Sequence, residues 1–271
     1  MSTRDLPDRA ALARAGDTRR PGFLRFARRY ARHRVGRGLD GLWVSGLDDA
    51  RAVLAERPVL FVANHVSWWD PILLIVLDEA LGGLGWAVMD SRNLRDVPFL
   101  GWVGALPLDR SSHDRSRECL QSCAALMTRP GRAMWIFPQG RQRPAHLRPL
   151  DLKHGVQTLH DHAPVDVVAV SLDYVFLERD RPAAVVRFAP PRPGAEVGGG
   201  ALLPAIEQDL LDGLAVIDAA ATEATDGGRA RRHPDDPLPG FVALVAPRGF
   251  GTPNGAGGRL LRLFDRRTRR G

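Results

Sequence analysis

The chain has 271 residues, of which 44% are hydrophobic and 25% are charged, a balance that excludes wholesale disorder and predicts one buried core. Its formal net charge of +7 predicts attraction to anionic surfaces, which include anionic lipid, phosphorylated substrates and nucleic acid. The start of the sequence lacks the apolar stretch of a signal peptide, and the most apolar window, residues 58–77, is interrupted by Asn64, His65, Asp70 and Pro71. We therefore expect a cytoplasmic protein whose contact with a membrane is peripheral.

A basic amphipathic helix is predicted near the N-terminus. Phe23, Phe26, Ala27 and Tyr30 follow the i, i+3, i+4, i+7 spacing of one helical face, and arginines occupy much of the remaining surface. Spacing alone leaves two alternatives equally open: the aromatic face packs on the core, or it lies on a membrane surface.

The middle of the chain alternates between apolar runs and helical patterns. This alternation predicts an α/β fold in which a mostly buried mixed sheet is flanked by helices. Asp70-Pro71 signals the start of a helix that runs to about residue 80, because proline favours the first helical position. The predicted strands are residues 42–44, 59–63, 84–89, 105–108, 133–137, 165–172 and 184–188, and the other predicted helices are residues 113–127, 153–162 and 203–222.

Composition divides the chain into three segments. Residues 1–37 form the basic amphipathic segment, residues 38–225 a single α/β domain, and residues 226–271 a tail rich in Gly, Pro and Arg. Cys119 and Cys123 lie four apart in a predicted helix and can build neither a disulfide framework nor a four-ligand zinc site. We expect both to be buried free thiols.

The most informative local pattern is residues 64–70, Asn-His-Val-Ser-Trp-Trp-Asp, between a buried strand and a helix. A histidine at such a strand end can take a proton from a hydroxyl group near neutral pH, and a carboxylate five residues later can fix its tautomer. Two alternatives remain open from these residues alone: His65 is structural, or Asp70 only caps the helix.

Further motifs follow in a fixed order. Residues 104–110 read Gly-Ala-Leu-Pro-Leu-Asp-Arg, residues 137–140 read Phe-Pro-Gln-Gly, and residues 152–155 read Leu-Lys-His-Gly. Together with His65 and Asp70, this series resembles the family of glycerolipid acyltransferases that includes lysophosphatidic acid acyltransferase. The resemblance spans about residues 41–174, and several ordered motifs are more specific than any one of them.

The resemblance implies an O-acyltransferase that moves a fatty-acyl group from acyl-CoA or acyl carrier protein to a lipid hydroxyl, at an anionic surface on the inner face of the cell membrane. It implies His65 as general base, Asp70 as its partner, Arg110 as a ligand for the acceptor's phosphate and Gly140 as part of the loop beneath it. The family's acceptor hydroxyl attacks the thioester directly. We therefore expect no covalent enzyme intermediate, no metal and no cofactor other than the acyl thioester as co-substrate.

The third motif departs from the family pattern. The family usually has Phe-Pro-Glu-Gly-Thr-Arg-Ser, whereas residues 137–143 read Phe-Pro-Gln-Gly-Arg-Gln-Arg. Gln139 replaces the acidic residue, and Gln142 stands where the family has arginine. Arg141 and Arg143 can still hold a phosphate through charge-assisted hydrogen bonds, so we place Gln139, Arg141 and Arg143 in the predicted acceptor site. The change predicts an altered acceptor rather than lost catalysis.

Other interpretations have less support. An inactive or weakly active lipid-binding relative would explain the altered third motif, but His65 and Asp70 are both retained. Net charge suggests a nucleic-acid-binding protein, yet no recognition helix, zinc finger or RNA-binding motif is present, and a hydrolase would need a Gly-x-Ser-x-Gly elbow. His160-Asp161-His162 has no further metal ligands nearby in sequence, and we expect these side chains to be solvated.

Overall fold

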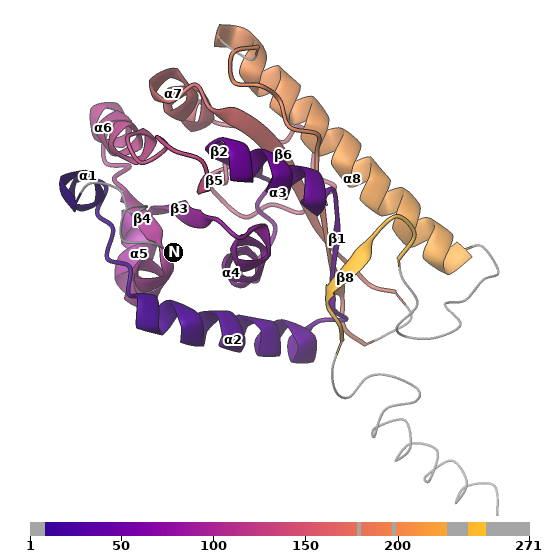
Figure 1. Cartoon of the computed structure of the whole chain (residues 1–271). Helices are drawn as coiled ribbons and strands as arrows, with labels where there is room; N and C mark the ends of the chain where they lie inside the picture. The colour runs from indigo at the N-terminus through magenta and orange to yellow at the C-terminus, as the bar shows by residue number, and fades with distance from the viewer. Residues whose placement is uncertain (1–8, 178–179, 197–198, 227–237, 248–271) are drawn as a thin grey trace, which may run out of the picture.

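The computed structural model describes residues 9–177, 180–196, 199–226 and 238–247 (Figure 1). Within these residues, eight strands form one mixed sheet in the order β4-β3-β5-β2-β6-β7-β1-β8. The pairs β6–β7 and β1–β8 are antiparallel, and the other neighbouring strands are parallel. The strands are β1 (Leu42–Ser45), β2 (Val59–Ala63), β3 (Leu84–Asp90), β4 (Ala105–Leu108), β5 (Arg132–Ile136), β6 (Asp166–Val175), β7 (Ala183–Phe188) and β8 (Val242–Val245).

Helices cover both faces of this sheet. Side chains of β2 alternate between the two faces, since Leu60 and Val62 join one hydrophobic cluster while Phe61 and Ala63 join another. The first cluster includes residues of α6, α7 and α8, and the second includes residues of α2, α3 and α4. The helices are α1 (Arg9–Arg14), α2 (Pro21–Gly38), α3 (Leu47–Glu56), α4 (Asp70–Leu81), α5 (Ser91–Asp96), α6 (His113–Ala124), α7 (Gly155–His162) and α8 (Leu202–Asp226), with 3-10 helices η2 (Pro98–Val103) and η3 (Gly199–Ala201).

The predicted fold class is confirmed: the chain has a mixed sheet flanked by helices and preceded by an N-terminal helix. All seven predicted strands form, and their boundaries differ from the predicted ones by at most three residues. Both cysteines are free, as expected; Cys123 is also buried as expected, whereas Cys119 is only half-buried. No described helix combines the length and the apolar character that crossing a membrane requires.

The segment predicted as a tail contributes a strand. Residues 242–245 pair with β1 at the edge of the sheet, and Phe241 and Leu238 are buried in a cluster with Trp43 and α8. The prediction that the α/β domain ends at residue 225 is therefore wrong for residues 238–247. Residues 227–237 and the predicted basic run at 259–270 lie outside the described residues.

Helix α2 packs through small residues rather than through its aromatic side chains. Ala27, Ala31 and Val35 are buried, and α2 lies beside α4 (Figure 1). Phe26 and Tyr30 are 61% and 51% exposed, and their rings stack with centroids 6.2 Å apart. Of the two alternatives for the aromatic face, packing on the core is thus wrong for these two residues.

One of the two histidines of α7 differs from expectation, while His162 is exposed as expected. His160 is buried, and burial lowers its pKa, because the sheet side of this short helix faces the core. The expectation that it is solvated is therefore wrong. Within the described ranges, no group of three potential ligand side chains is arranged to hold a metal ion.

Candidate active site

His65 follows β2 at the edge of the sheet where the parallel strands end. The preceding residue fixes this position: the Asn64 side-chain amide donates to the Leu172 carbonyl (2.9 Å) and accepts from the Leu172 N–H (2.7 Å). Because the carboxyl ends of parallel strands meet at one edge, residues following β3, β4 and β5 gather beside His65. The ring of His65 also stacks on Phe137, with centroids 4.5 Å apart.

A short hydrogen bond joins His65 to Asp70. The distance from His65 Nδ1 to Asp70 Oδ2 is 2.6 Å, and the Asp70 side chain is completely buried. The same oxygen accepts from the backbone N–H groups of Val66 (2.8 Å) and Ser67 (3.0 Å). With Nδ1 committed to this carboxylate, Nε2 is the ring nitrogen that remains to take a proton.

The cap-only alternative for Asp70 is wrong. Asp70 is the first residue of α4, the N-cap position belongs to Trp69, and no side chain caps the helix. The carboxylate turns back toward the 64–67 turn, where it holds two backbone N–H groups and the imidazole. The geometry is that of a histidine whose tautomer and orientation are fixed by an acid.

Tyr174, which was not among the predicted site residues, completes this arrangement. Its hydroxyl donates to the second oxygen of Asp70, Oδ1, at 2.5 Å. Burial and the neighbouring negative charge of Asp70 both raise the pKa of Tyr174, so the phenol keeps its proton and remains a donor. One sequence signal was present: Val170, Leu172 and Tyr174 share one apolar face of β6, and Tyr174 is the only one of the three with a polar end.

Gln139 and Arg143 hold the loop after β5 instead of facing a substrate. The Gln139 side chain is 3% exposed; its oxygen accepts from the His65 N–H (2.7 Å) and its nitrogen donates to the Leu150 carbonyl (3.0 Å). Arg143 is buried, donates to the Pro149 carbonyl (3.0 Å) and pairs with Asp151 (3.2 Å). Neither side chain lines the cavity described below, and the expectation that they contact the acceptor is therefore corrected.

The other predicted residues meet at the rim of a cavity. Arg110 donates to the Gly140 carbonyl (3.1 Å) and lies 3.8 Å from Asp90, and Gly140 has a positive φ of 64°. This positive φ, which residues other than glycine rarely adopt, explains the glycine at this turn. Arg141 is exposed and lies 3.7 Å from Asp151. The structure thus brings His65, Arg110, Gly140 and Arg141 to one cavity.

Two basic residues at this rim were not predicted as site residues. Arg92 and Lys153 line the same cavity as Arg110 and Arg141. Two hydrogen bonds from the Arg92 side chain to Asp90 hold the pKa of Asp90 below its usual value, and Lys153 does the same for Asp151. These carboxylates stay charged and order the four cations around the opening.

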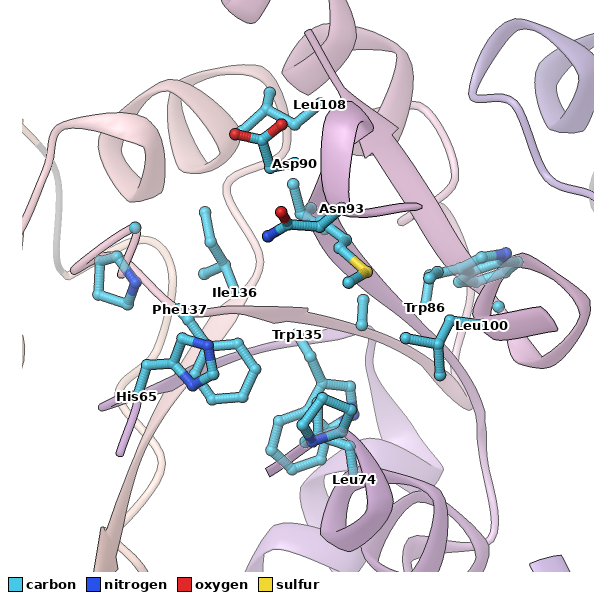
Figure 2. Close-up of a pocket in the computed structure, with 18 of the residues that line it drawn as sticks. His65, Leu74, Trp86, Asp90, Asn93, Leu100, Leu108, Trp135, Ile136 and Phe137 are labelled. Carbon is cyan, nitrogen blue, oxygen red and sulfur yellow. The ribbon is translucent and has the colours of Figure 1, made fainter. Parts of the chain in front are cut away.

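The cavity has a volume of about 460 Å³ and extends from the His65 edge between α4 and β3 toward η2. Figure 2 shows His65 and Phe137 on one side, Trp86 and Leu100 on the other, and Leu74 and Trp135 between them. Apolar side chains dominate its inner wall, including Pro71, Leu74, Ile75, Trp86, Val88, Met89, Leu100, Val103, Leu108 and Trp135. A cationic rim followed by an apolar interior suits an amphiphile with an anionic head and a hydrocarbon chain.

Comparison with known proteins agrees with this class of site. Residues 42–173 match the family model described as Acyltransferase. A stretch of 122 residues is 32% identical to the 1-acyl-sn-glycerol-3-phosphate acyltransferase of Saccharomyces cerevisiae, covering 43% of this chain and 39% of that protein. A stretch of 89 residues is 39% identical to the lyso-ornithine lipid O-acyltransferase of Pseudomonas aeruginosa, covering 31% of each chain.

A solved structure shares the fold. The crystal structure of the 1-acyl-sn-glycerophosphate acyltransferase PlsC from Thermotoga maritima aligns with a TM-score of 0.54 at 16% sequence identity, over 78% of this chain and 88% of that one. The two chains therefore share an α/β fold. The match to the family model over residues 42–173, together with the yeast relative, confirms the predicted resemblance to the glycerolipid acyltransferases. The chain covers less than half the length of the curated relatives it matches.

Proposed function

We propose that this protein transfers a fatty-acyl group from an acyl thioester to the hydroxyl of a lysolipid with an anionic headgroup. The observation that carries the proposal is the 2.6 Å contact between His65 Nδ1 and Asp70 Oδ2 at the opening of an apolar cavity with a cationic rim. The family match and the names of both relatives support acyl transfer to lipids. The same His-Asp geometry disfavours a merely lipid-binding protein, because binding alone does not require it.

In the proposed reaction, His65 Nε2 removes the proton of the acceptor hydroxyl as its oxygen attacks the thioester carbonyl carbon. A new C–O bond forms, and the carbonyl carbon becomes tetrahedral. When the C–S bond breaks, the thiolate leaves and takes the proton back from His65, so no atom remains on the enzyme. Asp70 stabilises the imidazolium that exists between the two proton transfers.

The proposed donor is acyl-CoA or acyl carrier protein, whose acyl chain would occupy the apolar interior. The proposed acceptor places its headgroup among Arg92, Arg110, Arg141 and Lys153. Gln142 lines this opening where the family usually has arginine, and the Pseudomonas relative is named for an acceptor other than lysophosphatidic acid. Both observations support an acceptor range that extends beyond lysophosphatidic acid.

We also propose that the enzyme works at the inner face of the cell membrane, held there by α2. Phe26 and Tyr30 are exposed on this helix, and the neighbouring arginines 25 and 29 are exposed as well. Aromatic side chains can enter the headgroup boundary while arginines meet anionic lipid.

The direct test is ester formation by the purified full-length chain. Lysolipids with anionic headgroups are incubated with palmitoyl-CoA or palmitoyl-acyl carrier protein in anionic vesicles, and the acylated products are identified by mass spectrometry. We expect time-dependent acylation of at least one lysolipid with release of one thiol per ester formed. Folded enzyme that acylates no lysolipid from either donor would contradict the proposal.

A further inference from the structure

The acyl cavity has a charged residue in its wall. Pro71, Leu74, Ile75 and Asp78 of α4 all line it, and their spacing of i, i+3, i+4 and i+7 places them on one helical face. Three of these residues are apolar, whereas the one farthest from the catalytic histidine carries a carboxyl group. A carboxyl group in the wall of a hydrocarbon site is unusual, because burying it without full pairing is costly.

This carboxyl group lies at the end of the cavity remote from His65. From Asp70, which contacts the histidine, to Asp78 is eight residues of helix, or about 12 Å at 1.5 Å per residue. Along the opposite wall, Gly85 is five residues before Asp90 on β3, or about 16 Å. Asp78 and Gly85 meet, since a Cβ at Gly85 would lie 1.7 Å from Asp78 Oδ1. The α4 wall and the β3 wall of the cavity therefore meet at Asp78 and Gly85, at the end remote from His65.

Helix α2 and the residues just before it supply more charged side chains at this end of the cavity. Arg19 donates to the Gly85 carbonyl and lies over the Trp86 ring at 4.8 Å, and Arg28 of α2 lies 3.9 Å from Asp78. Trp86, in turn, donates to Asp17 at 3.0 Å. These side chains, Asp17, Arg19, Arg28 and Asp78, are referred to below as the polar end.

Structural pairing alone does not account for Asp78. Its contact with Arg28, at 3.9 Å, is longer than a hydrogen bond. Burial raises the pKa of Asp78 by more than Arg19, the Gly85 N–H and the Trp135 indole lower it, so its partners do not offset its burial. By contrast, the adjacent residue Glu79 makes a 2.7 Å ion pair with Arg32 of α2, which already joins the two helices. Asp78 retains 16% exposure, and it is a lining residue of the cavity. Hydrocarbon that covered it would remove its remaining water without replacing it.

We propose that the polar end terminates the acyl site, so that the enzyme selects acyl donors of medium length, about ten carbons. An extended chain advances roughly 1.25 Å per bond, from a bond length near 1.5 Å and an angle near 111°. About 12 Å of wall between Asp70 and Asp78 therefore accommodates about ten carbons. This inference rests on the proposed function, because it takes the cavity to be the site of the acyl chain.

The test measures binding, so it does not depend on finding the acceptor. Saturated acyl thioesters of phosphopantetheine, the part that coenzyme A and acyl carrier protein share, are used with chains of about six to about sixteen carbons. Displacement of a fluorescent fatty acid from the full-length protein reports the affinity of each one. We expect affinity to rise about fourfold per methylene, the equivalent of about 0.8 kcal/mol, up to about ten carbons and to rise no further beyond that.

Three variants separate the polar end from general destabilisation. Asp78→Ala removes the carboxyl group and should let affinity keep rising for at least two more carbons, a gain of tenfold or more for a fourteen-carbon chain. Asp78→Asn keeps the size and polarity and should leave the limit in place. Glu79→Ala removes the neighbouring ion pair outside the cavity and should give the wild-type profile.

Two results would overturn the inference while leaving acyl transfer in place: a wild-type affinity that keeps rising to sixteen carbons, or an Asp78→Ala profile that superimposes on the wild-type one. Even if Asp78→Ala fails to fold, the dependence of wild-type affinity on chain length tests whether the acyl site ends at about ten carbons. No binding at any chain length would instead contradict the proposed function, and this inference with it.

Discussion

At the residue scale, the candidate site is a chain of three side chains: His65 and Asp70 are five residues apart in the sequence, and Tyr174 is 104 residues from Asp70. Tyr174 donates to Asp70, and Asp70 accepts from His65 and from two backbone N–H groups. Each oxygen of the carboxylate therefore has a defined role. Substitutions that change one oxygen at a time separate orientation from charge.

Asp70→Asn should lower kcat by about a hundredfold to ten-thousandfold. The amide can offer only one oxygen, whereas the carboxylate serves the imidazole, two N–H groups and the Tyr174 hydroxyl, so the wrong histidine tautomer becomes favoured. Steady-state kinetics of the folded variant check this. A loss of less than threefold would return Asp70 to a merely structural role.

Tyr174→Phe should reduce kcat by roughly tenfold, the equivalent of one hydrogen bond to a charged group, with little change in KM. The acid limb of the pH-rate profile should move to higher pH, because Asp70 loses a donor and holds the proton on His65 more tightly. A pH profile identical to that of the wild type would show that Tyr174 does not act through Asp70.

At the element scale, α2 has two separate roles. Its small residues pack toward α4, while Phe26 and Tyr30 remain exposed. Deleting the whole N-terminal segment would remove both roles and would also remove Arg19 and Arg28 from the inner end of the cavity. Point substitutions of the exposed aromatic residues are therefore the better test of membrane binding.

The double variant Phe26→Ser with Tyr30→Ser should bind anionic vesicles at least about tenfold more weakly, since each aromatic side chain contributes on the order of 1 kcal/mol or more when buried in lipid. High salt should weaken the binding of the wild type as well. Val216→Ser on α8, which covers the opposite face of the sheet, is the matched control. Equal sedimentation of the double variant and the wild type would reject α2 as the contact.

The buried carboxyl group of Asp78 on α4 should also lower the stability of the folded protein when it is ionised. Burial raises the pKa of Asp78, and the positive charges of Arg19 and Arg28 offset only part of the effect. The folded state therefore holds this proton more tightly than the unfolded state, so ionising Asp78 destabilises the fold as pH rises above the unfolded value near 4.

We expect Asp78→Asn to increase the free energy of unfolding at pH 7 and to have little effect at about pH 4. Denaturant unfolding of both proteins at the two pH values checks this sign. A variant less stable than the wild type at pH 7 would mean that the pairing of Asp78 with Arg28 outweighs its burial.

At the scale of the whole molecule, the sequence predicted what depends on local pattern. The strand before His65, the helix that starts at Asp70 and the order of the motifs follow from periodicity and residue type. The contacts of Gln139 with Leu150 and of Tyr174 with Asp70 join residues 11 and 104 positions apart and have no periodic signature. For the same reason the pairing of β8 with β1 was not predicted, since it joins the two ends of the domain.

The choice of acceptor also depends on residues from several elements, which meet at the opening of the cavity. Gln139 no longer supports an altered acceptor, because its side chain holds the loop, so the expectation rests on Gln142 at the opening and on the rim of four cations. With one acyl donor, we expect at least one other hydroxylipid to reach a kcat/KM within a hundredfold of that for lysophosphatidic acid. A larger advantage for lysophosphatidic acid over all others, roughly 2.7 kcal/mol or more, would make Gln142 a neutral change.

The central claim is that His65 is the base in acyl transfer, and acylation by the His65→Ala variant tests it most directly. Initial rates are compared with those of the wild type on the same vesicles, donor and lysolipid, and circular dichroism and thermal unfolding confirm that the variant is folded. Loss of a general base should lower turnover by about a hundredfold to ten-thousandfold. A folded His65→Ala protein that transfers acyl groups at the wild-type rate would contradict the mechanism.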